Sequence, residues 1–411
     1  MADAQALGGS ATGWPSVSEA TPRREQEDAY RAEFEATAIR SEERDGKPWV
    51  LLAESWFYPE SGGQLADRGS IGAARVDDVQ QDAHGRVWHR TDRDPGTGGC
   101  SARIDWSRRF DHMQQHTGQH VLSAAFEREA KAPTLSSTLG AERSVIEVGL
   151  AEADWRLVER IERAANQVVW EDRVLEQHWT DREHVGRFAL RKPPQIDGRI
   201  RIIEIPDWDL SACGGTHTRR TGEVGAIKVV GWERVRGNLR FSFQCGRRAL
   251  EDHAWRTEAM IESARRRTLR DRELIAHLER ACEERDLLRK RLTELERLAM
   301  AQEARRLVGD AALGVAVLAE ERSRDDARQF ALLALEAGAP WVVSGTLAPE
   351  PSLVVVAAPK PGSDLRSMLP ELLARARGKG GGSPVLLTIA PADAEAAREA
   401  HALAVQRLTA V

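Results

Sequence analysis

Short segments of alternating apolar and polar residues fill the chain between residues 26 and 108. Three of these segments are residues 32–39, 49–54 and 85–90, and Gly, Pro and Asp separate them. Alternation with a period of two between turn-forming residues is typical of short β-strands. The pattern therefore predicts a small β-rich domain over 26–108.

The pattern changes to a helical period after residue 109, and we expect a helix from about residue 111 to 129. Mixed segments follow it: strands within 135–150, an amphipathic helix at 154–170, and β-branched runs at 199–205 and 225–230 around a cysteine-glycine turn. This mixture predicts an α+β domain over 109–248.

Almost nothing interrupts a helical pattern between residues 247 and 307, which predicts a helical linker over 249–307. Its apolar residues recur at spacings of three, four and seven, with one interruption at Arg285: Leu274, Leu278, Ala281, Leu288, Leu292, Leu295 and Ala299. Such a stripe is typical of a coiled-coil partner helix or of a helical hairpin. The arginines of this region form either a phosphate-binding stripe or a solvated face: Arg265, Arg266, Arg267, Arg270 and Arg272.

Apolar strands alternate with helices beyond residue 308, which predicts a C-terminal α/β domain over 308–411. The expected strands are 314–318, 341–343, 353–357 and 385–389, and the expected helices are 324–336, 363–377 and 392–408. The whole chain is therefore expected to belong to the α+β class.

Composition narrows the class of protein. Of the 411 residues, 41% are hydrophobic and 30% are charged, as in a globular protein. No apolar run approaches the roughly 20 residues that span a bilayer. Residues 1–25 lack an apolar segment, so we expect a disordered tail rather than a secretory signal. The net charge of -5 does not exclude RNA, because RNA binding depends on local basic surface.

The four cysteines are spread along the chain, which does not suggest a disulfide framework. We therefore expect a cytoplasmic protein in which a cysteine serves as a metal ligand.

The strongest chemical signal is a pair of histidines on the first predicted helix. Residues four apart share one helical face, with β-carbons about 5–6 Å apart, which suits one metal ion. Further along, a cysteine and a histidine flank a Gly-Gly turn. Three imidazoles and a thiolate are donors that zinc prefers. We therefore predict four zinc ligands: His116, His120, Cys213 and His217.

Two questions about this site stay open. His112 lies one turn before His116 on the same face, and it either replaces His116 as a ligand or, as we expect, supports a ligand or faces the substrate. Four protein ligands are usual for a structural zinc, whereas a catalytic zinc keeps one position open.

A second signal is the segment Tyr58–Gln64, which contains the pair Gly62-Gly63. A Gly-Gly pair after a strand lets backbone N–H groups approach a ligand closely.

These segments together resemble the editing domain of alanyl-tRNA synthetase. Asp105–Trp106, Arg109–His112 and Gln115–His120 resemble the start of that domain. Cys213–His217 resembles its second metal motif, and Phe57–Gln64 its glycine-rich motif.

The resemblance extends along the chain. Residues 30–250 resemble the editing domain, and the helical stretch with the glycine run Gly378–Pro384 resembles the C-terminal, DHH-associated domain of the same synthetase. Too few residues precede the β-rich region for a domain that activates alanine. The chain therefore resembles the free-standing editing proteins called AlaX, in their long form.

The resemblance implies a zinc-dependent hydrolase that deacylates Ser-tRNA(Ala), with Gly-tRNA(Ala) left open as a second substrate. It implies tRNA(Ala) as the partner. The C-terminal domain, with the helical linker, would then either grip the body of the tRNA or mediate a homodimer. Thr138 falls where the family has a serine and is the candidate contact to the substrate hydroxyl, whereas Leu135 replaces a glutamine of the family.

The remaining site candidates are as follows. His112 joins Thr138 as a catalytic candidate, the 3′-terminal adenosine would meet Gly62, Gly63 and Gln64, and the phosphates would meet Arg68 and Arg109.

Two other functions fit the same residues. One is a zinc-stabilised tRNA-binding protein without hydrolytic activity, which the four-ligand count favours. The other is a zinc hydrolase of small serine esters, for which the C-terminal domain would have no use.

Overall fold

The computed structural model describes residues 20–194, 198–310, 313–358 and 364–410. Its contacts divide the chain into two compact units, Met1–Glu262 and Ser263–Val411. Both units mix helices and strands, in agreement with the expected α+β class. Within the described ranges, none of the helices is long and apolar enough to cross a membrane.

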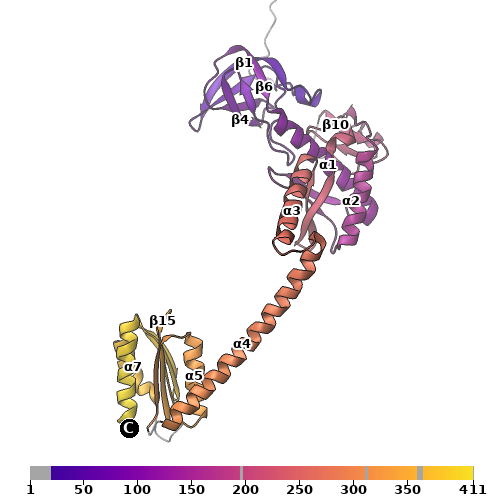
Figure 1. Ribbon diagram of the computed structural model, residues 1–411. Helices are drawn as coiled ribbons and strands as arrows, with labels where there is room; N and C mark the ends of the chain where they lie inside the picture. The colour runs from indigo at the N-terminus through magenta and orange to yellow at the C-terminus, as the bar shows by residue number, and fades with distance from the viewer. Residues whose placement is uncertain (1–19, 195–197, 311–312, 359–363, 411) are drawn as a thin grey trace, which may run out of the picture. The chain divides into compact units, whose positions relative to one another are not determined.

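The β-rich domain is a closed barrel with strand order β1-β2-β5-β4-β3-β6 (Figure 1). Its strands are β1 (Glu33–Arg44), β2 (Lys47–Leu52), β3 (Gly69–Ile71), β4 (Ala74–Gln81), β5 (Val87–Thr91) and β6 (Gly98–Ile104). The alternation read from the sequence places Phe34, Ala36 and Ala38 of β1 inside the barrel. The apolar face of each strand thus fills the barrel interior, as a period of two requires.

The segment just before the barrel is ordered, whereas the sequence predicted a disordered tail over residues 1–25. Residues 1–19 of that tail lie outside the described residues. The rest of it lies against the barrel, where Thr21 donates its N–H to the Gly85 carbonyl (3.1 Å) and Arg24 to the Ser55 carbonyl (2.8 Å). The short 3-10 helix η1 (Arg24–Gln26) follows, with the Glu25 side chain buried.

Helix α1 (Trp106–Ala130) is the centre of the first unit. Asp105 caps its first turn by accepting the Arg108 N–H (3.2 Å), and Lys131 ends it in a left-handed conformation with φ of 54°. The helix therefore begins five residues before the predicted start at 111. Its side chains are buried from Met113 to Phe126, because the barrel, two sheets and a second helix, α2 (Trp155–Trp170), pack around it.

Two sheets and a second helix pack around α1. One sheet has the order β11-β10-β9 and the other β12-β13-β8-β7, and all their pairs are antiparallel. The elements are β7 (Thr134–Leu139), β8 (Ser144–Val148), α2 (Trp155–Trp170), β9 (Glu176–Thr180), η2 (Val185–Arg187), β10 (Ile200–Ile205), β11 (Asp209–Ala212), η3 (Thr221–Val224), β12 (Ile227–Val235) and β13 (Asn238–Cys245). Their shared core includes Phe126, Ile161 and Phe241, each fully buried.

A buried ion pair joins the barrel to α1. The guanidinium of Arg109 is fully buried and binds the carboxylate of Asp67, and it also donates to the carbonyls of Ala29 and Trp56 (2.6 Å each). Asp67 also accepts the N–H of Tyr58 (2.6 Å). One carboxylate thus ties the start of α1 to the loop that follows β2.

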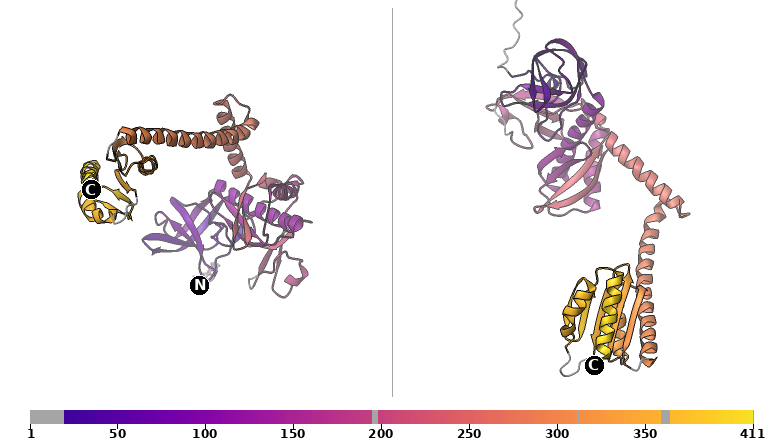
Figure 2. Two further views of the ribbon diagram at one scale, coloured as in Figure 1. Left: turned by 90° about the horizontal axis from the view of Figure 1, so that it is seen from below. Right: turned by 90° about the vertical axis from the view of Figure 1, so that its left-hand side faces the viewer.

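The predicted helical linker is broken. Helix α3 (Arg247–Arg265) ends near Thr268, whose φ of 56° is unusual for a β-branched residue. After η4 (Asp271–Glu273), helix α4 (Leu274–Asp310) runs without interruption (Figure 2). Most of the apolar stripe on α4 is exposed, as at Leu295 (63%). The partner helix therefore stays a prediction.

The second unit contains a five-stranded sheet with the order β14-β15-β16-β18-β17, in which only the β14–β15 pair is parallel. Helix α5 and the end of α4 cover one face, and α6 and α7 the other (Figure 1). The elements are β14 (Val315–Glu321), α5 (Arg324–Glu336), β15 (Trp341–Ala348), β16 (Ser352–Ala357), η5 (Leu365–Met368), α6 (Leu369–Ala376), β17 (Lys379–Ser383), β18 (Leu386–Ala390) and α7 (Ala394–Thr409). The predicted helix 363–377 is thus shorter, and residue 363 lies outside the described residues.

The glycine run forms the edge strand β17. A β-carbon at Gly378 or Gly382 would lie 1.9 or 2.0 Å from a carbonyl oxygen of the neighbouring strand β18. These glycines therefore allow a strand pairing that no larger residue permits.

Candidate metal centre

Two helical turns of α1 carry His116 and His120 on one buried face. Their ring centroids are 5.3 Å apart, and each side chain is about 95% buried. Gly118 lies between them, where a β-carbon would come within 2.2 Å of the Cys245 sulfur. Glycine at this position therefore lets α1 pack directly on β13 and holds the histidine face in place.

The turn after β11 carries Cys213 and His217 to the same point. The Cys213 sulfur is 3.2 Å from Nε2 of His116 and 3.2 Å from Nε2 of His217. One potential ligand atom from each of the four predicted residues lies within 4.8 Å of all the others. A β-carbon at Gly215 would be 2.1 Å from the His116 ring, so only glycine allows the turn to come this close.

The nitrogens that face away from this point are held by the protein. Nδ1 of His116 is 2.7 Å from the amide oxygen of Gln64, and Nδ1 of His217 is 3.2 Å from the Thr117 hydroxyl. Nδ1 of His120 is 2.9 Å from the Asp209 carboxylate. Partners of this kind fix the tautomer and orientation of histidines that bind a metal.

The acid–base properties of the cluster fit a cation. Although burial would raise the pKa of the Cys213 thiol, the neighbouring histidines hold it well below its usual range. Burial lowers the pKa of His217 to about 3. Burial also disfavours charge on His120, but its hydrogen bond to Asp209 and the nearby thiolate raise its pKa to about 9. Three imidazoles around a readily ionised thiol form a donor set that suits zinc.

A cavity of about 520 Å³ opens beside the cluster. Its wall includes His116, His120 and Cys213, and the hydroxyls and amide of Tyr58, Ser61, Gln119, Thr134, Ser136, Ser137 and Ser211. Apart from the ligand candidates, Arg191 and Lys192 are the charged residues on its described wall, and no carboxylate lines that wall. This cavity therefore suits an anionic ligand with hydrogen-bonding groups.

The sequence of this region matches a known domain. Residues 200–241 match the model of the threonyl and alanyl tRNA synthetase second additional domain. The alanine–tRNA ligase of Methanopyrus kandleri is 36% identical over 288 residues, which are 66% of this chain and 31% of that protein. The alanyl-tRNA editing protein AlaX-L of Pyrococcus horikoshii is 32% identical over 233 residues, which are 54% of this chain and 57% of that protein.

This chain is homologous to the editing domain of alanyl-tRNA synthetase. The chain spans about a third of the ligase and somewhat over half of AlaX-L.

The glycine-rich loop that contains Gly62 and Gly63 lies between the cluster and β7. Gly62 lines the cavity, and Gly63 accepts the N–H of Leu139 (2.7 Å). The structure gives Gln64 a different role from the predicted contact with an adenosine. Its side chain is fully buried and binds His116 and Thr216. Gln64 thus orients a metal-ligand candidate.

The two arginines predicted to contact phosphate differ in position. Arg68 is exposed, so its predicted contact remains a prediction. The position of Arg109 does not fit the predicted phosphate contact, because its side chain is fully buried and paired with Asp67. A guanidinium without solvent access cannot reach a phosphate, so Arg109 holds the fold together.

The two catalytic candidates lie away from the cavity wall. Thr138 is exposed and alternates with the buried Leu139, while Ser136 and Ser137 line the cavity. A bulge at Leu135 shifts the register of β7, which changes the side chains that face the cavity. His112 is buried, and burial with the charge of Arg108 lowers its pKa to about 4, so it is neutral at pH 7.

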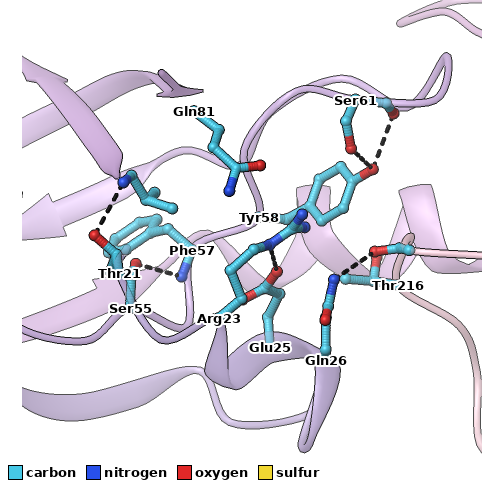
Figure 3. Close-up of polar contacts among 12 residues, drawn as sticks. Thr21, Arg23, Glu25, Gln26, Ser55, Phe57, Tyr58, Ser61, Gln81 and Thr216 are labelled. Atoms are coloured by element: carbon cyan, nitrogen blue, oxygen red, sulfur yellow. Dashed lines mark hydrogen bonds and ion pairs between the residues drawn. The ribbon is translucent and has the colours of Figure 1, made fainter. Parts of the chain in front are cut away.

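The sequence analysis assigned no individual role to three residues near the cluster, which are Asp209, Arg191 and Tyr58. Asp209 accepts hydrogen bonds from His120 and from Nε of Arg191 (2.6 Å), so it connects a ligand candidate to the cavity wall. Tyr58 forms another part of the wall. Arg23 lies over its ring, and Glu25 accepts a hydrogen bond from Arg23 (Figure 3). Of these residues, Asp209 could have been found from the sequence, because a carboxylate four positions before Cys213 can reach a metal-ligand candidate.

We expect zinc binding at pH 7 to release about one proton, which comes from His120, because an imidazole must be neutral to bind a metal. The metal-free protein protonates His120, whose pKa is about 9, but already ionises Cys213. Calorimetric titration in buffers of different ionisation enthalpy measures this number. In Asp209→Asn the proton release should fall toward zero and the zinc affinity about 10–100-fold.

The control for this measurement is Asp207→Asn, because Asp207 is a nearby carboxylate that does not contact His120. It should leave both quantities unchanged. An unaltered proton release in Asp209→Asn would show that Asp209 does not set the protonation of His120.

Proposed function

We propose that this chain is a trans-editing hydrolase that removes serine from mischarged tRNA(Ala), with glycine as a second substrate, and that it acts in the cytoplasm. The observation that carries the proposal is the cluster of three imidazoles and a thiol beside a cavity, in a chain homologous to an editing domain. The names of the homologues support the substrate class, and the donor set supports zinc.

The need for such an activity follows from the limits of binding selectivity. A pocket for alanine rejects glycine and serine by only a few kcal/mol, because the one is smaller and the other adds a single hydroxyl. A second site with polar partners for that hydroxyl discriminates far better, since an alanine ester would leave those partners unpaired. The hydroxyl-rich wall at Ser136 and Ser137 offers such partners.

The residues have separable roles in this proposal. A zinc ion held by the four donors would polarise the ester carbonyl or lower the pKa of a water molecule. Gln64 and Asp209 orient two of the histidines. The amide of Gln119 donates to Ser123 (2.7 Å), which leaves its carbonyl oxygen to accept a hydrogen bond from the substrate at the cavity wall.

The cations on the wall favour an RNA ester over a small ester. Arg191 and Lys192 lie beside the cluster, where the phosphate preceding a 3′-terminal adenosine would follow an ester bound in the cavity. Because Asp209 already binds Arg191, Lys192 is the freer of the two cations. Arg68 is exposed and is a further candidate for contact with the RNA backbone.

The decisive experiment follows the loss of ester from Ser-tRNA(Ala), Gly-tRNA(Ala) and Ala-tRNA(Ala). We expect fast loss of the serine ester and slow loss of the alanine ester. The variant His120→Ala, Cys213→Ala should lose the activity, whereas His84→Ala, Cys282→Ala changes the same residue types at exposed positions and should keep it. Binding of tRNA without ester loss would instead establish a zinc-stabilised RNA-binding protein.

A salt titration tests whether the substrate is RNA. The affinity of a protein for RNA falls with salt, and each contact between a cation and a phosphate adds about 0.7–0.9 to the magnitude of the slope of log affinity against log salt. Removing one such contact therefore makes the slope shallower by that amount. We expect Lys192→Gln to show this loss in tRNA binding, and Lys47→Gln, at an exposed barrel lysine, to show none. Equal slopes, together with hydrolysis of a small serine ester that uncharged tRNA(Ala) does not inhibit, would favour a small-ester hydrolase.

The homodimer belongs to the same proposal. The exposed stripe on α4 includes Leu288 and Leu292, and burying it against a second copy would remove apolar surface from water. We expect light scattering to give the mass of two chains, and Leu288→Glu, Leu292→Glu to give one. Thr293→Glu adds a charge beside the stripe and should leave the dimer intact. A single-chain mass for the wild type would exclude this role for α4.

A further inference from the structure

Arg201 is a buried cation in a strand of isoleucines. It lies on β10, its side chain is 6% exposed, and Ile200 and Ile202 on either side of it are fully buried. Burying a charge is costly unless hydrogen bonds compensate for the lost water. Burial lowers the pKa of Arg201, while the negative charges of Cys213 and Glu25 raise it. The contacts that hold this cation therefore point to its role.

Those contacts all lie on the turn that carries the cysteine. Nη1 of Arg201 donates to the Gly215 carbonyl at 2.6 Å and lies 3.5 Å from the Cys213 carbonyl. The backbone carbonyl of Arg201 accepts the N–H of Cys213 at 3.0 Å. One residue thus holds both ends of the turn, and Gln26 reaches the carbonyl of Gly214 between them (3.5 Å).

The peptide group between Gly215 and Thr216 is held on both sides. Arg201 binds its oxygen, and its N–H donates to the amide oxygen of Gln64 at 3.2 Å. The same Gln64 oxygen is 2.7 Å from Nδ1 of His116. A continuous series of hydrogen bonds therefore runs from Arg201 through this peptide and Gln64 to His116.

The turn needs such a restraint because two successive glycines lie within it. Glycine backbones change conformation at little steric cost, so the peptide groups of a Gly-Gly turn rotate easily. Rotation of the Gly215–Thr216 peptide would turn a carbonyl oxygen toward the amide oxygen of Gln64, which cannot donate to it. It would also move Cys213 relative to the histidine face of α1.

We propose that Arg201 is a positioning residue for the metal centre. It holds the Gly-Gly turn in one conformation, so that Cys213 and His116 can bind the same metal ion. The inference rests on the proposed metal centre. It assigns Arg201 neither to RNA binding nor to contact with the substrate.

Metal binding to the full-length protein tests this role without any ester. Zinc affinity is measured by competition with a chromophoric chelator, and the geometry by the thiolate-to-cobalt absorption of the cobalt(II) form. We expect Arg201→Gln to lower the zinc affinity about 10–100-fold and to weaken or shift the cobalt band. Arg201→Lys keeps a donor and should recover part of both.

The control is Arg199→Gln, because Arg199 is exposed, stacks on Trp179 and does not touch the turn. It should bind both metals as the wild type does. Wild-type zinc affinity and an unchanged cobalt band in Arg201→Gln would overturn the inference and leave Arg201 with a purely structural role. If Arg201→Gln does not fold, Arg201→Met, which keeps the apolar stem and removes the donor to the Gly215 carbonyl, decides in its place, since an unaltered cobalt band there has the same meaning. Absence of metal binding by the wild type would instead refute the proposed metal centre.

Discussion

The buried ion pair of Arg109 and Asp67 sets the position of α1, on which the rest of the first unit depends. Asp67 also binds the backbone of Tyr58, so the pair fixes both the helix and the loop that carries Gln64. Removing one partner of such a pair costs about 3–5 kcal/mol, because the other charge stays buried and unpaired. The rotation of α1 is therefore set at its first turn, and the histidine face two turns later follows from it.

A second level of order lies behind the ligand candidates. Gln64, Thr117 and Asp209 come from the barrel loop, from α1 itself and from β11, and each binds one histidine. Because these partners belong to three different elements, the centre can keep its geometry only if barrel, helix and sheet stay docked. The first unit accordingly behaves as one functional body.

Local patterns in the sequence were enough for some of this architecture. The spacing of His116 and His120 fixes a shared helical face, and a Gly-Gly turn lets Cys213 and His217 point the same way. The convergence of the side chains within each pair could therefore be predicted. Alternation likewise revealed the barrel strands. Each of these inferences depends on residues within a few positions of one another.

The remaining features depend on contacts that no local pattern encodes. The sequence predicted a phosphate contact for Arg109, but the barrel loop places Asp67 against its guanidinium. It predicted a substrate contact for Gln64, but the Gln64 amide binds His116. The bulge at Leu135 changed the side chains of β7 that face the cavity. Tertiary packing decides such positions, and a single sequence does not record it.

The distance along the chain between the two halves of the centre has a consequence for how the protein folds. His116 and Cys213 are separated by 97 residues, and that loop must close before they meet. The histidine pair on α1, in contrast, forms with the helix itself, since local contacts form before distant ones. The two histidines can therefore share a helical face without the thiolate nearby. For the proposed zinc centre, the histidine pair alone would select poorly among divalent metals, and the docked cysteine turn would supply the thiolate that favours zinc.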